Sequence, residues 1–236
     1  MCALRFTHYA LRDCSMIKLE NITKIFGQGD NETHALRGVS LFIEKGEFVA
    51  IMGPSGSGKS TMLHILGLLD SSTAGEQHLH GELVTALDED AKAALRNKNL
   101  GFVFQSFNLL PRTNVLENVK LPLMYSDIPA KNWDTHARKV IEQVGLSHRI
   151  DHEPSQLSGG EKQRVAIARA LVLQPSIIFA DEPTGNLDSV TSGQIMELFD
   201  ELHQAHGHTI ILITHEDDIA AHAQRIIRMH DGKIVV

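Results

Sequence analysis

The glycine-rich stretch at residues 53–61 constrains this chain more than any other, because it joins an apolar run at residues 48–52 to a helical pattern. Such glycines let successive backbone N–H groups turn inward on a polyphosphate, and the N-terminus of the following helix adds its dipole. The Lys59 ammonium can reach the β- and γ-phosphates, and the Ser60 hydroxyl can hold Mg²⁺. A glycine-rich turn without a ligand is the alternative, but the order of strand, turn and helix favours a phosphate-binding loop. The candidate phosphate ligands are Gly53, Pro54, Ser55, Gly56, Ser57, Gly58, Lys59, Ser60 and Thr61.

Composition limits the classes of partner. With 236 residues and 42% hydrophobic content, the chain can form one α/β domain, alone or with a subdomain. Its 22 basic and 29 acidic residues give a net charge of −7, which argues against nucleic acid or an anionic lipid surface as a partner. No apolar run approaches the ~20 residues that span a bilayer, so a membrane role needs a membrane partner. The only cysteines, Cys2 and Cys14, indicate a reducing compartment, and we expect the cytoplasm.

The N-terminal residues 1–15 differ from the rest of the chain. They lack the continuous apolar centre of a signal peptide, and the first alternating segment begins directly after Met16. We therefore expect a disordered extension at residues 1–15 and a folded domain at residues 16–236. On this view Met16 is also the candidate natural translation start.

Hydrophobic periodicity predicts the order of elements. An antiparallel β layer is expected from alternating runs at residues 17–26 and 39–43, and a hairpin at residues 77–84. A helix after the phosphate loop is expected to bury Met62, Leu63, Ile65, Leu66 and Leu69. A further helix is predicted at residues 91–96, and a strand at residues 101–104 that ends in Gln105. Four prolines break residues 106–156 into short helical pieces, which indicates an inserted helical subdomain.

A second helix is predicted to begin at residues 157–164 and to run to about Leu173. Ser158 and Glu161 have the spacing of a capping box, which stabilises a helix by about 1 kcal/mol and needs no ligand. Gly159 and Gly160 are unusual in the first helical turn, because they weaken it while clearing side chains from a row of N–H donors. This arrangement suits a second anion-binding helix end.

Acidic and imidazole groups follow two further apolar strands. Asp181 and Glu182 close the strand at residues 176–182, where the Mg²⁺ carboxylate of a phosphate-loop ATPase belongs, and His215 follows the strand at residues 209–213. Ligands of parallel α/β sheets bind at the carboxyl ends of strands. The predicted fold is therefore an α/β P-loop NTPase with a mainly parallel sheet, an antiparallel β subdomain and an inserted helical subdomain. The residues that converge at the strand ends are Gly53, Gln105, Asp181, Glu182 and His215.

Two groups of histidines are candidates for surface metal sites. Neither His78 with His80, nor His203 with His206 and His208, has a carboxylate or cysteine frame that the sequence reveals. Solvated histidines are therefore the preferred interpretation.

The motifs together resemble the nucleotide-binding subunit of an ATP-binding-cassette (ABC) transporter over residues 16–236. Residues 53–60 resemble the Walker A motif, Gln105 the Q-loop, residues 157–163 the family signature, residues 177–182 the Walker B motif, residues 186–188 the D-loop and His215 the switch histidine. Phe26 lies where this family places the aromatic residue that stacks on adenine, although the pattern alone favours a core or hairpin aromatic. Residues 60–67, 95–97 and 107–111 resemble the branch that serves lipoprotein release and macrolide or peptide export.

The resemblance implies a mechanism and partners. It implies a head-to-tail homodimer, or a pair with a paralogous ABC subunit, in which ATP on one Walker A loop is covered by Ser158, Gly159 and Gly160 of the other subunit, with Asp188 nearby. Asp181, Ser60 and Gln105 are the implied Mg²⁺ ligands. Gln105, Glu182, His215 and Lys59 are the implied catalytic residues.

Hydrolysis of ATP is expected to power a separate integral membrane permease of the exporter or lipoprotein-release type. The subunit would then lie peripherally on the inner face of the cell membrane. The alternative is an ABC ATPase that regulates a membrane partner without transport, in cell-wall or cell-division signalling. A nucleic-acid-linked ABC ATPase is disfavoured by the net charge and by the absence of a long coiled-coil insertion or a second cassette.

Overall fold

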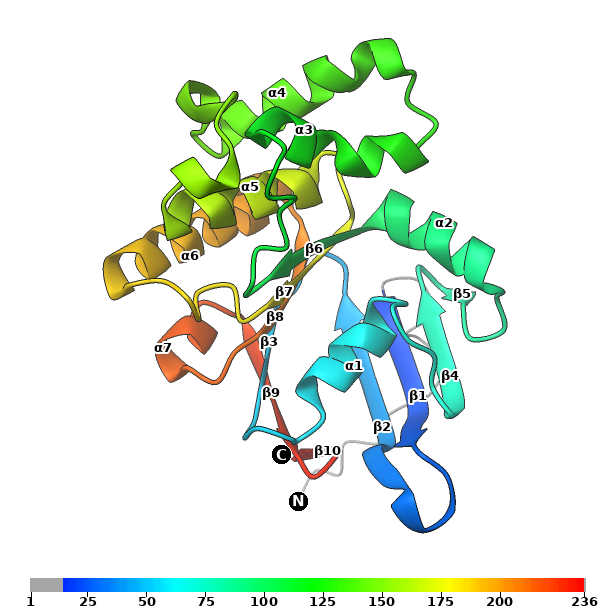
Figure 1. The fold of residues 1–236 in the computed structure, drawn as a ribbon. Coiled ribbons are helices and arrows are strands. Elements are labelled where there is room, and N and C mark those ends of the chain that lie inside the picture. The colour runs from blue at the N-terminus through cyan, green and yellow to red at the C-terminus, as the bar shows by residue number, and fades with distance from the viewer. Residues whose placement is uncertain (1–14, 236) are drawn as a thin grey trace.

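A computed structural model describes residues 15–235 of the chain (Figure 1). Of the extension predicted at residues 1–15, residues 1–14 lie outside the described residues. Ser15 already belongs to the first strand, where it pairs with Glu44, so the described fold begins one residue before Met16.

The elements alternate between strands and helices along most of the chain. The strands are β1 (Ser15–Phe26), β2 (Thr33–Glu44), β3 (Phe48–Met52), β4 (Ala74–Leu79), β5 (Glu82–Leu83), β6 (Leu100–Phe104), β7 (Ile177–Asp181), β8 (Thr209–Ile213), β9 (Arg225–His230) and β10 (Lys233–Val235). The α-helices are α1 (Lys59–Leu66), α2 (Glu89–Asn99), α3 (Val115–Lys120), α4 (Trp133–Gln143), α5 (Gly159–Leu171), α6 (Ser189–His206) and α7 (Asp217–Ala220). Short 3₁₀ helices are η1 (Gly29–Asn31), η2 (Leu121–Tyr125), η3 (Ala130–Asn132), η4 (Ser147–Arg149) and η5 (Pro154–Gln156).

The central sheet has six strands in the order β10-β9-β3-β8-β7-β6. The pairs from β9 to β6 are parallel, and β10 joins antiparallel at the edge through a hairpin at Asp231 and Gly232. Every residue of β3 and β8 is buried, because helices or a second sheet cover both faces. The predicted, mainly parallel core is confirmed.

Side-chain alternation sends successive residues of the sheet into two separate cores. Ile210 and Leu212 of β8 face a core that they share with α3 to α6, whereas Ile211 and Ile213 face a core shared with α1, β1 and β2. Figure 1 shows these layers, with α1 between the central sheet and the antiparallel strands, and α5 and α6 beyond the other face. The sheet therefore lies between two packed layers, which fix the positions of the loops at its edge.

The two additional parts of the predicted fold are present. A four-stranded antiparallel sheet, in the order β2-β1-β4-β5, includes the hairpin predicted around Gly81. The stretch predicted to be helical at residues 106–156 holds α3, α4 and four 3₁₀ turns, and its two α-helices pack on α5. Buried Val119, Val140 and Ile141 form part of that packing.

Three details of the sequence prediction were wrong. Helix α1 ends at Leu66, because Gly67 caps it and the chain then turns through Leu68 at φ 56°, so Leu69 is 44% exposed instead of buried. Helix α2 begins at Glu89, two residues early, because the side chain of Asp88 caps it by accepting a hydrogen bond from the Ala91 N–H at 2.8 Å. Helix α5 ends at Leu171, two residues before the expected Leu173.

The packing of β6 against α5 depends on a glycine, which gives a test of the fold. A Cβ atom on Gly101 would lie 2.7 Å from the carbonyl oxygen of Ala170 and 3.1 Å from the Pro175 ring. We expect Gly101→Ala to lower the free energy of unfolding by about 1–3 kcal/mol, because backbone must shift to admit the methyl group. Urea titration monitored by circular dichroism measures this change.

The matched control is Gly193→Ala in the exposed part of α6. A Cβ atom on Gly193 meets nothing within 4 Å. This variant should be as stable as the wild type or gain up to ~1 kcal/mol from helix propensity. An unchanged or raised midpoint for Gly101→Ala would contradict the described packing.

Candidate functional site

The phosphate loop connects β3 to α1, as the sequence predicts. Gly58 caps the helix with φ 97°, a left-handed conformation that glycine adopts without strain, and α1 begins at Lys59. The buried Lys59 ammonium donates hydrogen bonds to the carbonyl oxygens of Gly53 at 2.8 Å and of Pro54 at 3.0 Å. The loop therefore places a cation and a helix N-terminus against the same space.

A cavity of about 610 Å³ opens at this loop. Glu182 and His215 also face it, so residues from the ends of β3, β7 and β8 meet in one place. Of the predicted site residues, the cavity is lined by Gly53, Pro54, Ser55, Gly56, Gly58, Lys59, Ser60, Thr61, Glu182 and His215. Ser57 of the loop is buried, and its hydroxyl has no hydrogen-bond partner within residues 15–235.

Glu182 and His215 form a hydrogen-bonded pair at the mouth of this cavity. The Nδ1 atom of His215 lies 3.0 Å from Oε1 of Glu182. The backbone N–H of Glu182 donates to the carbonyl oxygen of Ile213 at 2.9 Å, and Glu182 itself has φ 45°. The left-handed turn lets the Glu182 side chain leave the sheet directly after β7, so both groups face the phosphate loop.

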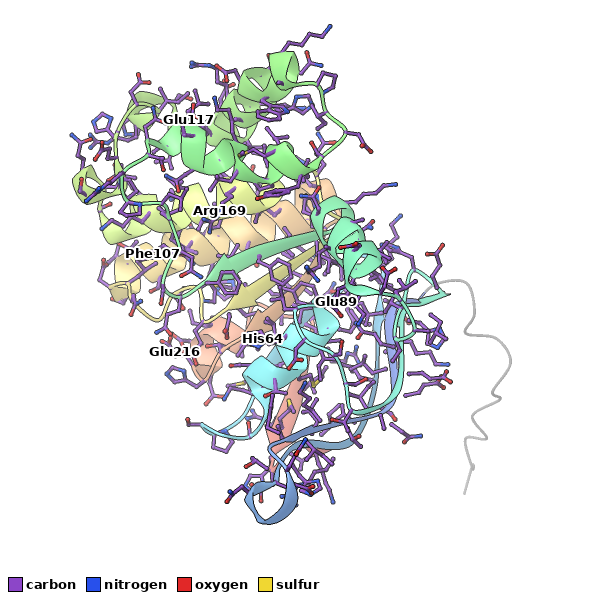
Figure 2. The ribbon with its side chains drawn as sticks, turned by 45° about the vertical axis from the view of Figure 1, so that its right-hand side comes forward. His64, Glu89, Phe107, Glu117, Arg169 and Glu216 are labelled. Carbon is purple, nitrogen blue, oxygen red and sulfur yellow. The ribbon has the colours of Figure 1, made fainter. Side chains whose placement is uncertain are left out.

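Asp181 lies beside this pair at the end of β7. Burial, and secondly the neighbouring carboxylate of Glu182, raise the pKa of Asp181, while His64, which Figure 2 labels on α1, and Lys59 at the start of the same helix oppose the shift. A partly buried carboxylate with raised pKa is stabilised in its charged form by a bound cation. The hydroxyl of Ser60, the carboxylate of Asp181 and the amide oxygen of Gln105 are the oxygen donors that Mg²⁺ prefers, so the predicted residues fit this ion.

Gln105 is placed by the loop that follows β7. Its carbonyl oxygen accepts a hydrogen bond from the Asn186 side chain at 2.9 Å, and a Cβ on Gly185 would lie 2.7 Å from its Nε2 atom. Gln105 is not among the residues that line the cavity. The structure therefore ties the end of β6 to the loop after β7 and packs the Gln105 amide against Gly185.

The predicted second anion site lies apart from the phosphate loop of the same chain. Ser158 caps α5, and the capping box is complete: the Ser158 hydroxyl accepts from the Glu161 N–H at 3.3 Å and the Ser158 N–H donates to Glu161 Oε2 at 2.8 Å. A Cβ atom on Gly160 would collide with Thr191, and one on Gly159 would lie 3.0 Å from Leu187. The side chains of Leu187 and Thr191 thus leave little room for a side chain at either glycine, a packing reason that the sequence did not reveal.

Two other predicted nucleotide contacts also lie outside the cavity lining. Asp188 caps α6, and its carboxylate accepts hydrogen bonds from the N–H groups of Val190 and Thr191 and from the Thr191 hydroxyl at 2.6 Å, which lower its pKa. Phe26 ends β1 with 45% of its surface exposed, and the Lys24 ammonium lies 4.8 Å from its ring centre. Their roles toward nucleotide remain predictions.

Sequence reasoning missed three residues of the cavity. Thr33, His34 and Ala35 line it from the start of β2, opposite the phosphate loop. Strand β2 lies close to the phosphate loop: a Cβ on Gly58 would lie 2.5 Å from the Ala35 carbonyl oxygen. The available signal was their position directly after the turn that follows Phe26, but only the tertiary fold brings them to the loop.

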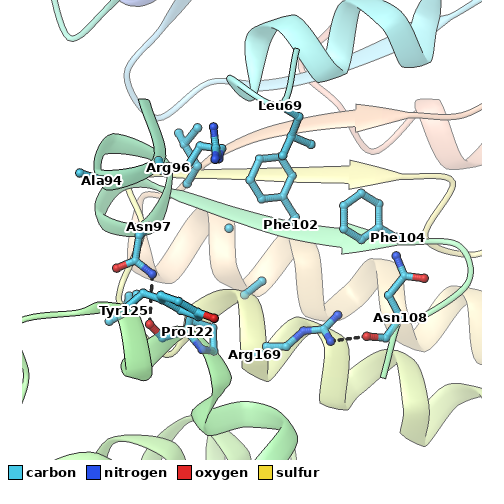
Figure 3. A pocket seen from close by; sticks show the side chains of 15 residues that line it. Leu69, Ala94, Arg96, Asn97, Phe102, Phe104, Asn108, Pro122, Tyr125 and Arg169 are labelled. Atoms are coloured by element: carbon cyan, nitrogen blue, oxygen red, sulfur yellow. Dashed lines mark hydrogen bonds between the residues drawn. The ribbon is translucent and has the colours of Figure 1, made fainter. Parts of the chain in front are cut away.

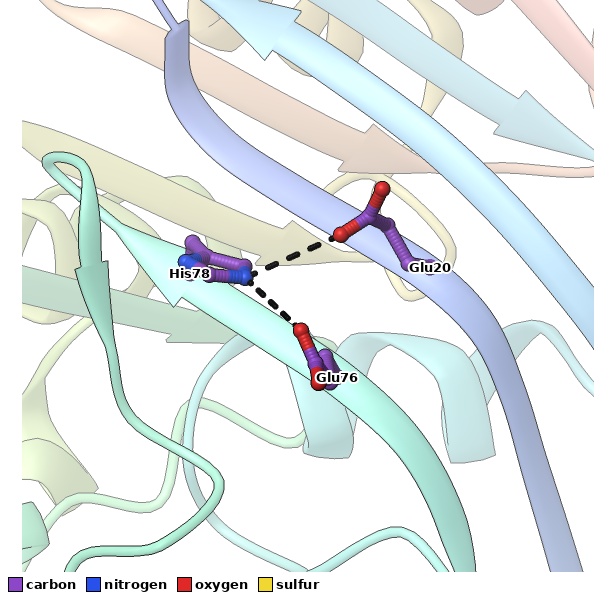
Figure 4. A group of neighbouring side chains, drawn as sticks. All are labelled: Glu20, Glu76 and His78. Atoms are coloured by element: carbon purple, nitrogen blue, oxygen red, sulfur yellow. Dashed lines mark hydrogen bonds and ion pairs between the residues drawn. The ribbon is translucent and has the colours of Figure 1, made fainter. Parts of the chain in front are cut away.

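The histidine groups differ partly from expectation. His78 has the carboxylate frame that the sequence did not reveal: its Nε2 atom lies 3.4 Å from Glu76 and 3.8 Å from Glu20 across two paired strands (Figure 4). The other oxygen of Glu20 pairs with the Lys18 ammonium at 2.8 Å. In the second group, His208 is half-buried and its Nδ1 atom lies 2.9 Å from the Pro175 carbonyl oxygen, so this histidine has a structural contact instead of the expected solvated position.

A larger groove of about 700 Å³ lies away from the phosphate loop, between α2, β6 and the helical stretch (Figure 3). Its apolar lining includes Leu69, Phe102, Phe104 and Tyr125, whose surface is 81% exposed. Arg169 of α5 closes one end by donating to the carbonyl oxygen of Phe107 at 2.8 Å and to that of Asn108 (Figures 2 and 3). This groove offers exposed aromatic surface without catalytic groups.

Within residues 15–235, no helix combines the length and the apolar character needed to cross a membrane.

Known proteins resemble this chain along most of its length. The family model described as ABC transporter matches residues 36–185. The macrolide export ATP-binding/permease protein MacB of Chlorobium luteolum is 54% identical over 220 residues, which are 93% of this chain and 33% of that protein. An ABC transporter ATP-binding protein of Thermotoga maritima is 49% identical over 93% of both chains.

A solved structure shows the same fold. It is an ATP-binding cassette in a dimeric post-hydrolysis state bound to ADP and Pi; it is 44% identical and superposes with a TM-score of 0.86 over 94% of this chain and 97% of its own. The chain spans about a third of the length of the MacB protein and nearly all of the Thermotoga maritima protein. The chain therefore belongs to the ABC transporter family.

Proposed function

We propose that this protein binds and hydrolyses ATP and thereby powers a membrane transporter through a separate permease. The observation that carries the proposal is the convergence of Lys59, Glu182 and His215 on one cavity at the phosphate loop. Phosphoryl transfer needs mainly positioning and charge stabilisation, which a loop of N–H donors and a buried ammonium supply.

Each residue has a definite task in this proposal. Lys59 and the N-terminus of α1 hold the β- and γ-phosphates, and Phe26 stacks on adenine. Glu182 polarises the attacking water, and His215, which is hydrogen-bonded to Glu182, contacts the γ-phosphate. Bound Mg²⁺, held by Ser60, Asp181 and Gln105, would neutralise charge on the phosphate oxygens.

Two copies of the chain are proposed to share the nucleotides. Ser158, Gly159 and Gly160 lie outside the cavity of their own subunit, so they need a second copy, or a paralogous subunit, to reach a γ-phosphate. The dimeric cassette bound to ADP and Pi supports this arrangement for a relative of 44% identity. Two helix N-termini, α1 of one copy and α5 of the other, would then share one triphosphate.

The apolar groove is the proposed docking site for the permease, on the inner face of the cell membrane. It exposes Tyr125 and Leu69 beside the Phe102 and Phe104 rings, as an interface anchor requires. The relative of 54% identity carries a permease in the same chain and is named for macrolide export, which supports a system of the exporter or lipoprotein-release type.

The Glu182→Gln variant tests the hydrolytic role. Loss of the carboxylate removes the group that orients water but leaves the phosphate loop intact, so turnover should fall at least ~100-fold while ATP binding persists. Phosphate release and fluorescent-nucleotide binding measure the two effects. Glu216→Gln is the matched control, because Glu216 follows His215 in the chain but does not line the cavity. Near-wild-type turnover for Glu182→Gln would remove Glu182 from this role.

Dimer formation is tested by Ser158→Arg. The bulky side chain would obstruct the N-terminus of α5, so a single subunit should still bind nucleotide while the ATP-dependent dimer is lost. Size-exclusion chromatography with ATP, in the Glu182→Gln background, reads out the dimer directly. Ser40→Arg, at an exposed position of β2, controls for the added charge and size. An ATP-dependent dimer that forms unchanged with Ser158→Arg would refute the shared site.

Docking on the membrane is tested by Tyr125→Glu. A carboxylate in the groove should reduce recovery of the protein with native membranes by at least ~10-fold, because burying an unpaired charge in an interface is costly. Co-sedimentation with washed membranes from the native host provides the measurement. Leu83→Glu, on exposed β5, is the control, and equal loss for both variants would argue against the groove as docking site.

A further inference from the structure

Helix α5, which begins with the signature residues, carries a negative charge near its N-terminus. In the proposed dimer, this N-terminus binds the γ-phosphate of the partner's nucleotide. Glu161 lies in the first turn of α5, three residues after Ser158. Hydrogen bonds from the backbone and side chain of Ser158, together with Arg149, lower the pKa of Glu161 to about 2. The carboxylate is therefore charged at neutral pH and lies beside the N–H groups that would meet the partner's nucleotide.

Both oxygens of this carboxylate are engaged. Oε2 accepts the Ser158 N–H at 2.8 Å and the Ser158 hydroxyl at 2.9 Å, while Oε1 accepts from Nε of Arg149 at 2.8 Å. To bind a phosphate, the Ser158 hydroxyl must turn its proton away from Oε2. A carboxylate without a counter-ion would hold that proton more strongly and would repel the approaching phosphate.

Arg149 comes from a different element. It ends η4, and its guanidinium also approaches Nε2 of His152 at 3.2 Å, so its side chain is held in place from two sides. The guanidinium lies against Glu161, on the side of the carboxylate away from Ser158. Arg149 thus forms an ion pair with Glu161, the acidic side chain in the first turn of α5.

We propose that Arg149 is a positioning residue for the ATP-dependent dimer: by neutralising Glu161, it frees the Ser158 hydroxyl and the N-terminus of α5 to accept the γ-phosphate of the partner's nucleotide. This inference rests on the proposed shared site. It goes beyond that proposal because Arg149 does not line the cavity at the phosphate loop of its own subunit.

The test measures the dissociation constant of the ATP-dependent dimer in the Glu182→Gln background by sedimentation velocity. Arg149→Gln should weaken the dimer about 10-fold, within the range for coupled contacting pairs, while nucleotide binding to the single subunit stays unchanged. Adding Glu161→Gln should restore the dimer, because the uncompensated charge is gone. The defect of Arg149→Gln should also shrink at high salt, whereas Arg149→Lys should keep most of the function.

A purely structural role predicts the opposite pattern. If the ion pair only holds η4 against α5, the double variant Arg149→Gln, Glu161→Gln should form the dimer as weakly as Arg149→Gln alone. Arg225→Gln is the matched control, because Arg225 and Glu47 form an ion pair of similar exposure, 35% and 16% against 36% and 20%. It should leave the dimer constant unchanged.

Three results would overturn the inference: an unchanged dimer with Arg149→Gln, failure of the double variant to recover, or equal weakening by Arg225→Gln. A Glu182→Gln protein that stays monomeric in saturating ATP would instead refute the proposed shared site, and this inference with it. The two failures are therefore distinguishable.

Discussion

The parallel pairing of β7 with β8 determines where the chemistry of this protein can take place. Asp181 is paired with Ile213, and the next residue, Glu182, donates its N–H to the Ile213 carbonyl oxygen. A second hydrogen bond, from the Thr214 N–H to the Ile51 carbonyl oxygen at 3.3 Å, ties the end of β8 to β3. The phosphate loop, the carboxylates and the histidine are thus held by neighbouring strands of one rigid sheet, and none depends on a long loop for its position.

Positive and negative groups lie side by side at this edge of the sheet. The chain is acidic overall, yet a buried lysine and the N-terminus of α1 lie where a polyphosphate would bind. The carboxylates of Asp181 and Glu182 lie next to these positive groups, and burial disfavours the charge on Asp181. Local placement, not net charge, therefore decides which anions this surface can accept.

Much of this arrangement was predictable because the signals are local. The order of strand, glycines and helix identified the phosphate loop, the spacing of Ser158 and Glu161 predicted a capping box that the structure contains, and continuous apolar runs indicated parallel strands. Thr33 to Ala35 escaped notice because they reach the cavity only through the packing of β2 against α1. Glu20 beside His78 was missed for a similar reason, since the pairing of β1 with β4 brings it there from far along the chain. The predicted end of α1 was wrong because Leu69, an apolar residue expected in the buried face of the helix, lines a surface groove instead.

Helix α5 connects two regions that the sequence treats as separate. Its first turn carries the signature residues, and Arg169, near its last turn, is hydrogen-bonded to the backbone of Phe107 and Asn108 beside the apolar groove. Those two residues have positive φ angles, and Arg169 adds its hydrogen bonds to those that their own N–H groups donate to the carbonyl oxygens of Phe104 and Ser106. A helix of this length is a stiff rod of roughly 20 Å. Any partner that displaces the loop must therefore either break the hydrogen bonds of Arg169 or move α5, including its first turn with the signature residues.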